Sequence, residues 1–314
     1  MVEHRALFDA HVERWIDALP EGGLYEPMAY LLRLPAKRIR PVLSMMACEL
    51  FGGRSQDVLD QALGIELFHN FTLMHDDIMD AASLRRGKPT VHAKWNTNTA
   101  ILSGDAMLVM AYRSMGTDAR VLDVFNAYAL DVCKGQQLDM EFEQRHDVSL
   151  VEYREMIRLK TAVLLAASLR IGAIKAGASV VDQDRIGAFG ENLGLAFQLR
   201  DDLLDAFGEP HITGKEQGGD LRNGKKTWLL IRGLEREQAT GTSVLKQQLE
   251  RPAAHRDVPA MAEALRMLGV DAEAEAEVRR LESMAASSLE AIDPSRVRTA
   301  PLFTLAEALR VRAA

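Results

Sequence analysis

Apolar residues recur along this chain three and four positions apart, the period of an α-helix that buries one face. The segment containing Val121, Phe125, Tyr128 and Val132 is one example. Leu, Ala, Met, Glu and Arg, which favour helices, dominate the composition, and runs of alternating Val, Ile, Thr or Tyr are missing. The pattern therefore predicts an all-α protein.

Two of the predicted helices are apolar on nearly every side, within residues 61–83 and 186–207. A helix without a clean polar face is usually central in a large bundle. Neither a shift in composition nor a Ser- and Pro-rich linker marks a domain boundary along the sequence. We therefore expect a single domain over residues 1–314.

Charge and cysteine content narrow the class of protein. The 314 residues include 38 Lys and Arg against 45 Asp and Glu, which argues against a nucleic-acid or anionic-membrane binder. Cys48 and Cys133 are too few for a disulfide framework. The N-terminal residues carry charges throughout, and the longest apolar stretch, 162–169, is far shorter than the roughly 20 residues of a membrane helix. We expect a soluble, cytoplasmic protein without membrane insertion.

Each of the two apolar helices carries the same acidic motif, DDxxD. Composition alone predicts about 0.1 matches to this motif, so two copies 125 positions apart are informative. On a helix, the first and fifth residues of the motif share a face. The six acidic residues are Asp76, Asp77, Asp80, Asp201, Asp202 and Asp205.

Three carboxylates on one helical turn among Phe, Leu and Met need a counter-charge, because burying unpaired like charges is costly. Mg²⁺ is bound in proteins through one or two carboxylates together with waters and substrate phosphates. The two clusters therefore predict Mg²⁺ sites. The alternative for a single cluster is a solvated acidic patch at a helix end.

Basic residues accompany both clusters and suggest that the ions bind diphosphate groups. A third basic group precedes Pro41, which can begin a helix, so that an anion there would also meet helix N–H groups. Singly, such residues are more often solvated loop residues, but together they predict a site for two diphosphates. The three groups are Arg85, Arg86 and Lys88; Lys215, Lys225 and Lys226; and Lys37, Arg38 and Arg40.

The order and spacing of six segments resemble the all-trans isoprenyl diphosphate synthases, also called polyprenyl synthetases. The resemblance covers most of residues 34–230, whereas the last 80 or so residues carry no motif of the family. The matching segments are AKRIRP (36–41), ELFHNFTLMHDDIMDAASLRRGKPTVH (66–92), LSGDAML (102–108), LKTAVLL (159–165), FQLRDDLLDAFG (197–208) and GKEQGGDLRNGKKTWL (214–229).

The resemblance implies a bundle of helices around a central cavity, usually a homodimer. It implies a reaction that joins an allylic diphosphate to isopentenyl diphosphate, head to tail, with release of pyrophosphate. Mg²⁺ would be the cofactor, about three ions per active site. Ionising the allylic diphosphate places negative charge on the leaving group, so fixed cations carry the catalysis and no side-chain nucleophile is needed.

The resemblance also implies a role for each matching residue. The six Asp residues of the two motifs would bind Mg²⁺. The allylic diphosphate would be held by Arg85, Lys160, Thr161, Gln198, Lys215 and Lys225. Isopentenyl diphosphate would be held by Lys37, Arg40, His69 and Arg86. The catalytic set would be Asp76, Asp80, Lys160, Thr161, Gln198, Asp201 and Lys215, with Thr161 and Gln198 steadying the carbocation.

Product length in this family depends on the residues just before the first motif. Thr72, one helical turn (roughly 5.4 Å) before Asp76, is small, and Phe71 beside it is bulky. In the family this combination favours geranylgeranyl diphosphate, a C20 product, with the C15 product farnesyl diphosphate as the alternative. Phe71 could instead be a core residue.

Two other functions fit parts of the sequence. A class I terpene cyclase also uses DDxxD, but such enzymes usually replace the second acidic cluster, which is intact here. An inactive regulatory subunit of a heteromeric synthase tends to have lost one or both clusters, whereas all six acids are present. We therefore expect an active short-chain prenyltransferase.

Overall fold

The computed structural model describes residues 1–208 and 218–312, and its backbone divides into two compact units. The first unit comprises residues 1–129 and 167–187, and the second comprises 130–166 and the chain from 188 onward. The chain crosses between the units within three helices: α7 (Ala119–Gln144), α9 (Val163–Lys175) and α10 (Val180–Phe207). The expectation of a single domain stays a prediction.

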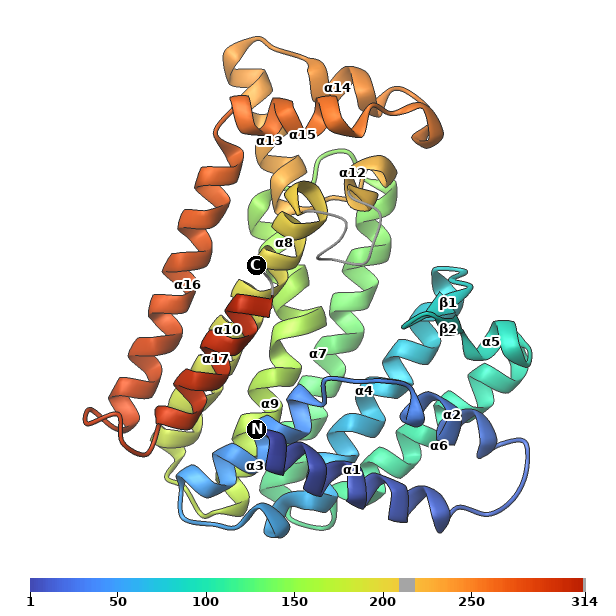
Figure 1. The fold of residues 1–314 in the computed structure, drawn as a ribbon, viewed down its shortest axis with the longest axis vertical. Helices are drawn as coiled ribbons and strands as arrows, with labels where there is room; N and C mark the ends of the chain where they lie inside the picture. Colours follow the sequence, from blue (N-terminus) through green and yellow to red (C-terminus); the bar gives the residue numbers. More distant parts are fainter. Residues whose placement is uncertain (209–217, 313–314) are drawn as a thin grey trace. The chain divides into compact units, whose positions relative to one another are not determined.

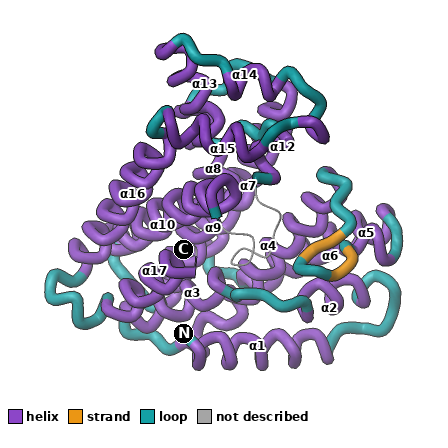
Figure 2. The backbone as a smooth tube through the Cα atoms, turned by 45° about the horizontal axis from the view of Figure 1, so that its top comes forward, coloured by secondary structure: helices purple, strands orange, loops and turns teal. Residues whose placement is uncertain are grey.

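The described chain is almost entirely helical, apart from one two-stranded hairpin (Figure 2). The predicted all-α class is therefore confirmed. No helix within residues 1–208 and 218–312 is both long and apolar enough to cross a membrane. The first unit contains α1 (Val2–Asp17), α2 (Glu26–Arg33), α3 (Ile39–Leu50), a 3-10 turn (Ser55–Val58), α4 (Leu59–Met79), β1 (Leu84–Arg85), β2 (Lys88–Pro89), α5 (Val91–Lys94) and α6 (Thr97–Met115).

The centre of the first unit is α4, which packs against α3 and α6 (Figure 1). A Cβ atom on Gly64 would lie 2.9 Å from the carbonyl oxygen of Ala111, so the absence of a side chain lets α4 and α6 approach closely. Phe68 is fully buried and meets Phe125 edge to face, with 5.4 Å between ring centroids. This packing fixes α4, which ends in the first acidic motif.

The helix expected to begin at Pro41 begins two residues earlier, at Ile39. Arg38 is its N-cap and adopts a left-handed conformation with φ of 52°. Pro41 therefore lies inside the first turn, where the backbone N–H that proline lacks would have no helical partner anyway. The earlier start follows from the buried ion pair of Arg38 described below.

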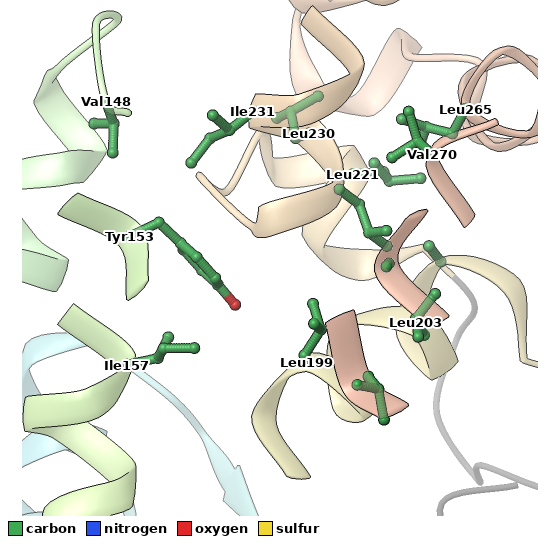
Figure 3. Close-up of a cluster of buried hydrophobic side chains, with 14 of the residues drawn as sticks. Val148, Tyr153, Ile157, Leu199, Leu203, Leu221, Leu230, Ile231, Leu265 and Val270 are labelled. Atoms are coloured by element: carbon green, nitrogen blue, oxygen red, sulfur yellow. The ribbon is translucent and has the colours of Figure 1, made fainter. Parts of the chain in front are cut away.

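The second unit is built around a separate apolar core (Figure 3). Leu199 and Leu203 of α10 face Tyr153, Leu230 and other residues of this core. At one end of the unit, α14 packs against α13 and α15, and both of these helices pack against α16 (Figure 1). The bounds are α8 (Leu150–Ile157), a π-helix (Arg158–Ala162), α12 (Gly219–Asn223), α13 (Trp228–Thr240), α14 (Val244–Leu249), a 3-10 turn (Ala253–His255), α15 (Val258–Met267), α16 (Val270–Ile292) and α17 (Ala300–Arg312).

The π-helix carries Lys160 and Thr161, two predicted site residues, and two glycines let its neighbours approach it. A Cβ on Gly135 of α7 would lie 2.3 Å from the backbone nitrogen of Lys160. A Cβ on Gly194 of α10 would lie 2.6 Å from the Cα of Ala162. Since π-helical turns are rare and frequent at functional sites, this close packing fixes an unusual backbone at the predicted site.

Candidate active site

The first acidic motif lies at the C-terminal end of α4. Asp76 and Asp77 are in the last turn, and Asp80 is the C-cap. The unsatisfied carbonyl groups at this end of a helix carry partial negative charge, so three carboxylates here repel both one another and the helix dipole. No basic residue in the same turn offsets them. The helix therefore ends in a strongly negative site that favours a bound cation.

The three acids differ in their surroundings. Asp80 is exposed and Asp76 is half-buried, whereas the Asp77 side chain is nearly fully buried. Arg85 of β1 contacts both oxygens of Asp77: its Nε donates to Oδ2 at 2.7 Å, and its Nη2 lies 2.7 Å from Oδ1. Such two-point pairing of a guanidinium with a carboxylate is strong and directional. The charge of Asp77 is therefore compensated by Arg85. The role of Asp77 as a metal ligand stays a prediction.

A tight hairpin carries Arg85 and Arg86 back to the end of α4. The two turn residues, Arg86 and Gly87, have φ of 53° and 73°, as the two-residue turns that match the twist of a β-hairpin require. Arginine rarely adopts positive φ, so this turn holds the backbone of Arg86 in one unusual conformation. Lys88 is exposed on the returning strand.

Arg38, Arg40, Arg86 and His69 form what we call the arginine cluster, and Glu66 of α4 is its buried anion. The Glu66 Oε1 atom accepts from Nη1 of Arg38 at 2.7 Å, and both side chains are buried. The Nη1 atom of Arg40 donates to Nε2 of His69 at 3.1 Å. Burial, opposed by the charge of Glu66, lowers the pKa of Arg40 to about 10, so Arg40 stays charged at neutral pH.

His69 is neutral in this cluster. Burial lowers its pKa well below 6.5, and the charges of Arg40 and Arg86 lower it further. Because Arg40 can only donate, Nε2 of His69 accepts and the ring proton lies on Nδ1. No role for Glu66 was expected from the sequence, although its position among apolar residues of α4, three before His69, was the available signal.

The second acidic motif lies within the last two turns of α10, which continues two residues beyond it. Asp201 is exposed, and the half-buried Asp205 accepts a hydrogen bond at 3.0 Å from the backbone N–H of Asp220. Asp202 is only 5% exposed. It accepts from the hydroxyl of Tyr153 and, at 3.2 Å, from Nε2 of Gln198. Burial raises the pKa of Asp202 to about 7, with a further contribution from the charge of Asp220.

Lys160 and Thr161 of the π-helix both make side-chain contacts in the second unit. Lys160 donates to Oδ2 of Asp139 on α7 at 2.6 Å. Thr161 donates from Oγ1 to Oε1 of Gln198 at 3.4 Å. The structure therefore brings together four predicted residues, Lys160, Thr161, Gln198 and Asp202, within one unit. Asp139 was missed, because it is one of several acidic and polar residues at the end of α7 and nothing in the sequence distinguishes it from them.

The remaining predicted residues are placed as follows. Lys37 and Lys225 are exposed, and Lys215 lies outside the described residues. Phe71 is half-buried and lies between Phe68 and His75, with ring centroids 5.7 Å and 4.8 Å away. The Thr72 hydroxyl donates to the carbonyl oxygen of His69 at 2.8 Å. Phe71 is thus part of an aromatic cluster beneath the first acidic motif without being sealed inside the core.

Within the described residues, no three His, Cys, Asp or Glu side chains converge to hold a metal ion by themselves. A hard cation such as Mg²⁺ does not need such a cage, because it keeps several waters and uses one or two carboxylates with substrate phosphates. The pair formed by Asp76 and Asp80, one helical turn apart at a negative helix end, fits that requirement. The all-α fold, the acidic motifs and the arginine cluster together define a protein suited to phosphorylated substrates.

The chain belongs to the polyprenyl synthetase family, whose model matches residues 21–267. A geranylgeranyl diphosphate synthase from Methanosarcina mazei is 41% identical over 239 residues, covering 72% of this chain and 74% of that protein. Relatives named geranylfarnesyl diphosphate synthase also match, at 36% identity. The expected family is confirmed, and with it prenyltransferase activity on small diphosphate substrates.

Solved structures of the family share the fold. A crystal structure of a geranylgeranyl pyrophosphate synthase has a TM-score of 0.92 and 40% identity, covering 98% of this chain and 97% of the other. The enzyme of that name from Corynebacterium glutamicum, solved with isoprenyl diphosphate and magnesium, has a TM-score of 0.80 and 30% identity over 99% and 96% of the two chains.

The neutral state of His69 predicts a pH dependence of stability. As the pH falls below about 6.5, the unfolded chain protonates this histidine while the folded protein resists it, so stability decreases. We expect His69→Gln to remove this component, at most about 2 kcal/mol of unfolding free energy between pH 6.5 and 5. Urea unfolding of both proteins at pH 7 and pH 5 measures the difference. An equal loss of unfolding free energy in both proteins between pH 7 and pH 5 would show that His69 is protonated in the folded state.

Proposed function

We propose that this protein is a geranylgeranyl diphosphate synthase. It joins isopentenyl diphosphate to allylic diphosphates up to a C20 product and releases pyrophosphate. The observation that carries the proposal is the pair of DDxxD motifs, one at the C-terminal end of α4 and the other within the last two turns of α10. The intact arginine cluster adds to it, because a second diphosphate-binding group suits a reaction with two diphosphate substrates.

Each group of charges has a task in this reaction. The carbon–oxygen bond of the allylic diphosphate breaks, and pyrophosphate leaves with the electron pair. The double bond of isopentenyl diphosphate then forms the new carbon–carbon bond, and a proton is lost. We assign isopentenyl diphosphate to Lys37, Arg40, His69 and Arg86. We assign the allylic diphosphate to Arg85, Lys160, Thr161, Gln198, Lys215 and Lys225.

We assign Mg²⁺ binding to the first and last acids of each motif, about three ions per active site. Asp76, Asp80, Asp201 and Asp205 are the best supported, because their side chains are exposed or half-buried at helix ends. When bound, Mg²⁺ stabilises the charge that develops on the leaving diphosphate. Lys160, whose ammonium group is held by Asp139, and Arg85, held by Asp77, keep their positive charges fixed in place beforehand.

The C20 product is supported by the relatives named for it and by the residues before the first motif. Phe71 carries an aromatic ring at the fifth position before Asp76, while Thr72 at the fourth is small. The half-buried position of Phe71 is compatible with a ring that ends the product cavity. A C15 product is the alternative from the sequence, and the geranylfarnesyl relatives add a longer one.

A class I terpene cyclase and an inactive regulatory subunit are less well supported. The arginine cluster would have no second diphosphate to bind in a cyclase. All four predicted ligands at Asp76, Asp80, Asp201 and Asp205 would be superfluous in an inactive subunit.

We propose that the protein is a homodimer. Apolar residues are exposed along one side of α6, among them Leu102 at 61% and Val109 at 68%, with Ile101 and Tyr112 beside them. A row of exposed apolar side chains on one helix is typical of a surface that another chain covers. Sedimentation equilibrium should therefore give twice the 34.8 kDa of one chain, whereas Val109→Asp should lower the mass toward that of the monomer.

We propose a cytoplasmic location, in keeping with two cysteines that form no disulfide, the buried Cys48 and the exposed Cys133. Fractionation of cells producing the protein, with thiol labelling of Cys133, is the check. A membrane-bound or oxidised protein would contradict it.

The reaction can be tested with labelled isopentenyl diphosphate and, separately, dimethylallyl, geranyl and farnesyl diphosphates. We expect a Mg²⁺-dependent C20 alcohol after dephosphorylation of the product, and no product in the presence of a chelator. Asp76→Ala and Asp80→Ala should each lower kcat by at least about 100-fold, because fixed charges at the leaving group dominate such catalysis.

The outcomes separate the candidate functions. Hydrocarbon or alcohol without dephosphorylation would indicate a cyclase, and no product from any starter would indicate an inactive subunit. Full activity of the Asp76 and Asp80 variants would remove the metal assignment, provided that circular dichroism shows the native helix content. Thr97→Ala, on α6 and outside the proposed sites, serves as the control for expression and handling.

Phe71→Ala tests the product-length assignment. If the ring ends the product cavity, its removal should move the main product from C20 to C25 or longer, with kcat for the first condensation changed less than about tenfold. Chromatographic sizing of the dephosphorylated products measures this. Loss of a core aromatic can cost about 3 kcal/mol, so thermal unfolding accompanies the assay. An unchanged C20 product from a folded variant would assign Phe71 to core packing alone.

A further inference from the structure

Tyr153 is a buried tyrosine that belongs neither to the proposed substrate sites nor to the proposed metal ligands. It lies on α8 and is 2% exposed, and its ring projects toward α10 with the hydroxyl pointing inward, beside Leu199 (Figure 3). A buried tyrosine hydroxyl almost always has a hydrogen-bond partner. Here the partner is Oδ2 of Asp202, in the middle of the second acidic motif.

The other oxygen of Asp202 determines which way the Gln198 amide faces. Its Oδ1 atom accepts from the amide nitrogen of Gln198, at 3.2 Å. The amide oxygen must then point the opposite way, where it accepts from the Thr161 hydroxyl at 3.4 Å. Asp202 and Gln198 are four residues apart on α10 and share one face of the helix.

These contacts form one continuous chain of hydrogen bonds in the second unit, from Tyr153 through Asp202 and Gln198 to Thr161. The two ends of the chain lie on α8 and on the π-helix that directly follows it. Within this chain the orientation of each group follows from its neighbour, because the carboxylate accepts at both oxygens. Both oxygens of Asp202 are engaged by side chains, one from α8 and one from α10.

We propose that Tyr153 is a positioning residue for the prenyl transfer: through Asp202, it holds the Gln198 amide with its oxygen toward Thr161. The inference rests on the proposed function and assigns Asp202 a task other than metal binding. The amide oxygen is the negative end of the group's dipole. Presented at Thr161, it favours the positive charge of an allylic carbocation, whereas the reversed amide would present its positive end there.

The test is Tyr153→Phe, which keeps the ring and removes the hydroxyl. We expect kcat to fall about 10- to 100-fold, because a misoriented group at the reacting carbon costs rate rather than binding. The KM values for both substrates should change less than about twofold. Tyr128→Phe is the matched control: its hydroxyl accepts from Arg170 at 3.2 Å within the first unit, and its loss should leave kcat unchanged.

A double-mutant cycle distinguishes positioning from a general structural effect. If Tyr153 acts through Gln198, then Tyr153→Phe added to Gln198→Leu should lower kcat less than about twofold further. Two independent reductions that multiply would overturn the proposal. So would an unchanged kcat of Tyr153→Phe.

Metal binding is followed separately, by the rise in melting temperature that Mg²⁺ and pyrophosphate cause together. Tyr153→Phe and Asp202→Asn should both retain this rise while losing kcat. Asp202→Asn has one acceptor oxygen for two donors and tests the same contact if Tyr153→Phe does not fold. Loss of the rise in either folded variant would make Asp202 a metal ligand and overturn the positioning role. If the wild-type enzyme elongates no starter, the proposed function is overturned, and this inference is overturned with it.

Discussion

The structure as a whole depends on how the repulsion among carboxylates near two helix C-termini is compensated. At the end of α4, three acids face the negative pole of their own helix, with no basic residue in the last turn. The three acids of the second motif lie within the last two turns of α10. Such an arrangement lowers the stability of the isolated chain. It persists in proteins where a bound cation and its ligands compensate the charge, which is the situation expected of a diphosphate-binding enzyme.

The chain manages part of this charge with its own side chains. In each motif the second acid is buried and its oxygens are engaged: Asp77 by Arg85, and Asp202 by Tyr153 and Gln198. The first and last acids of each motif are exposed or half-buried. One repeated sequence motif therefore contains two kinds of carboxylate, a buried one that organises neighbouring side chains and a more exposed one. The inner acids hold Arg85 and Gln198 in fixed orientations before any substrate binds.

The arginine cluster shows the same principle with the opposite sign. Bringing Arg38, Arg40 and Arg86 together costs energy, and the buried carboxylate of Glu66 offsets part of it through its bond to Arg38. Burial, and then the charges of the neighbouring arginines, lower the pKa of Arg40 and of His69. An anionic ligand would complete the balance. The neutral His69, which accepts from Arg40, adds a polar group without adding charge.

The sequence by itself determined the all-α class, the family and the two acidic motifs, because helical periodicity and the spacing of charged residues are local properties. It also placed Lys160, Thr161 and Gln198 in one functional group before their contacts were known. Only the tertiary structure decided which acid of each motif is buried, that α3 begins at Ile39 with Arg38 paired to Glu66, and that Asp139 and Tyr153 hold site residues. Each of these depends on which side chain from a distant segment reaches the same point. Helix packing determines such a pairing, and the spacing of residues within either segment alone does not predict it.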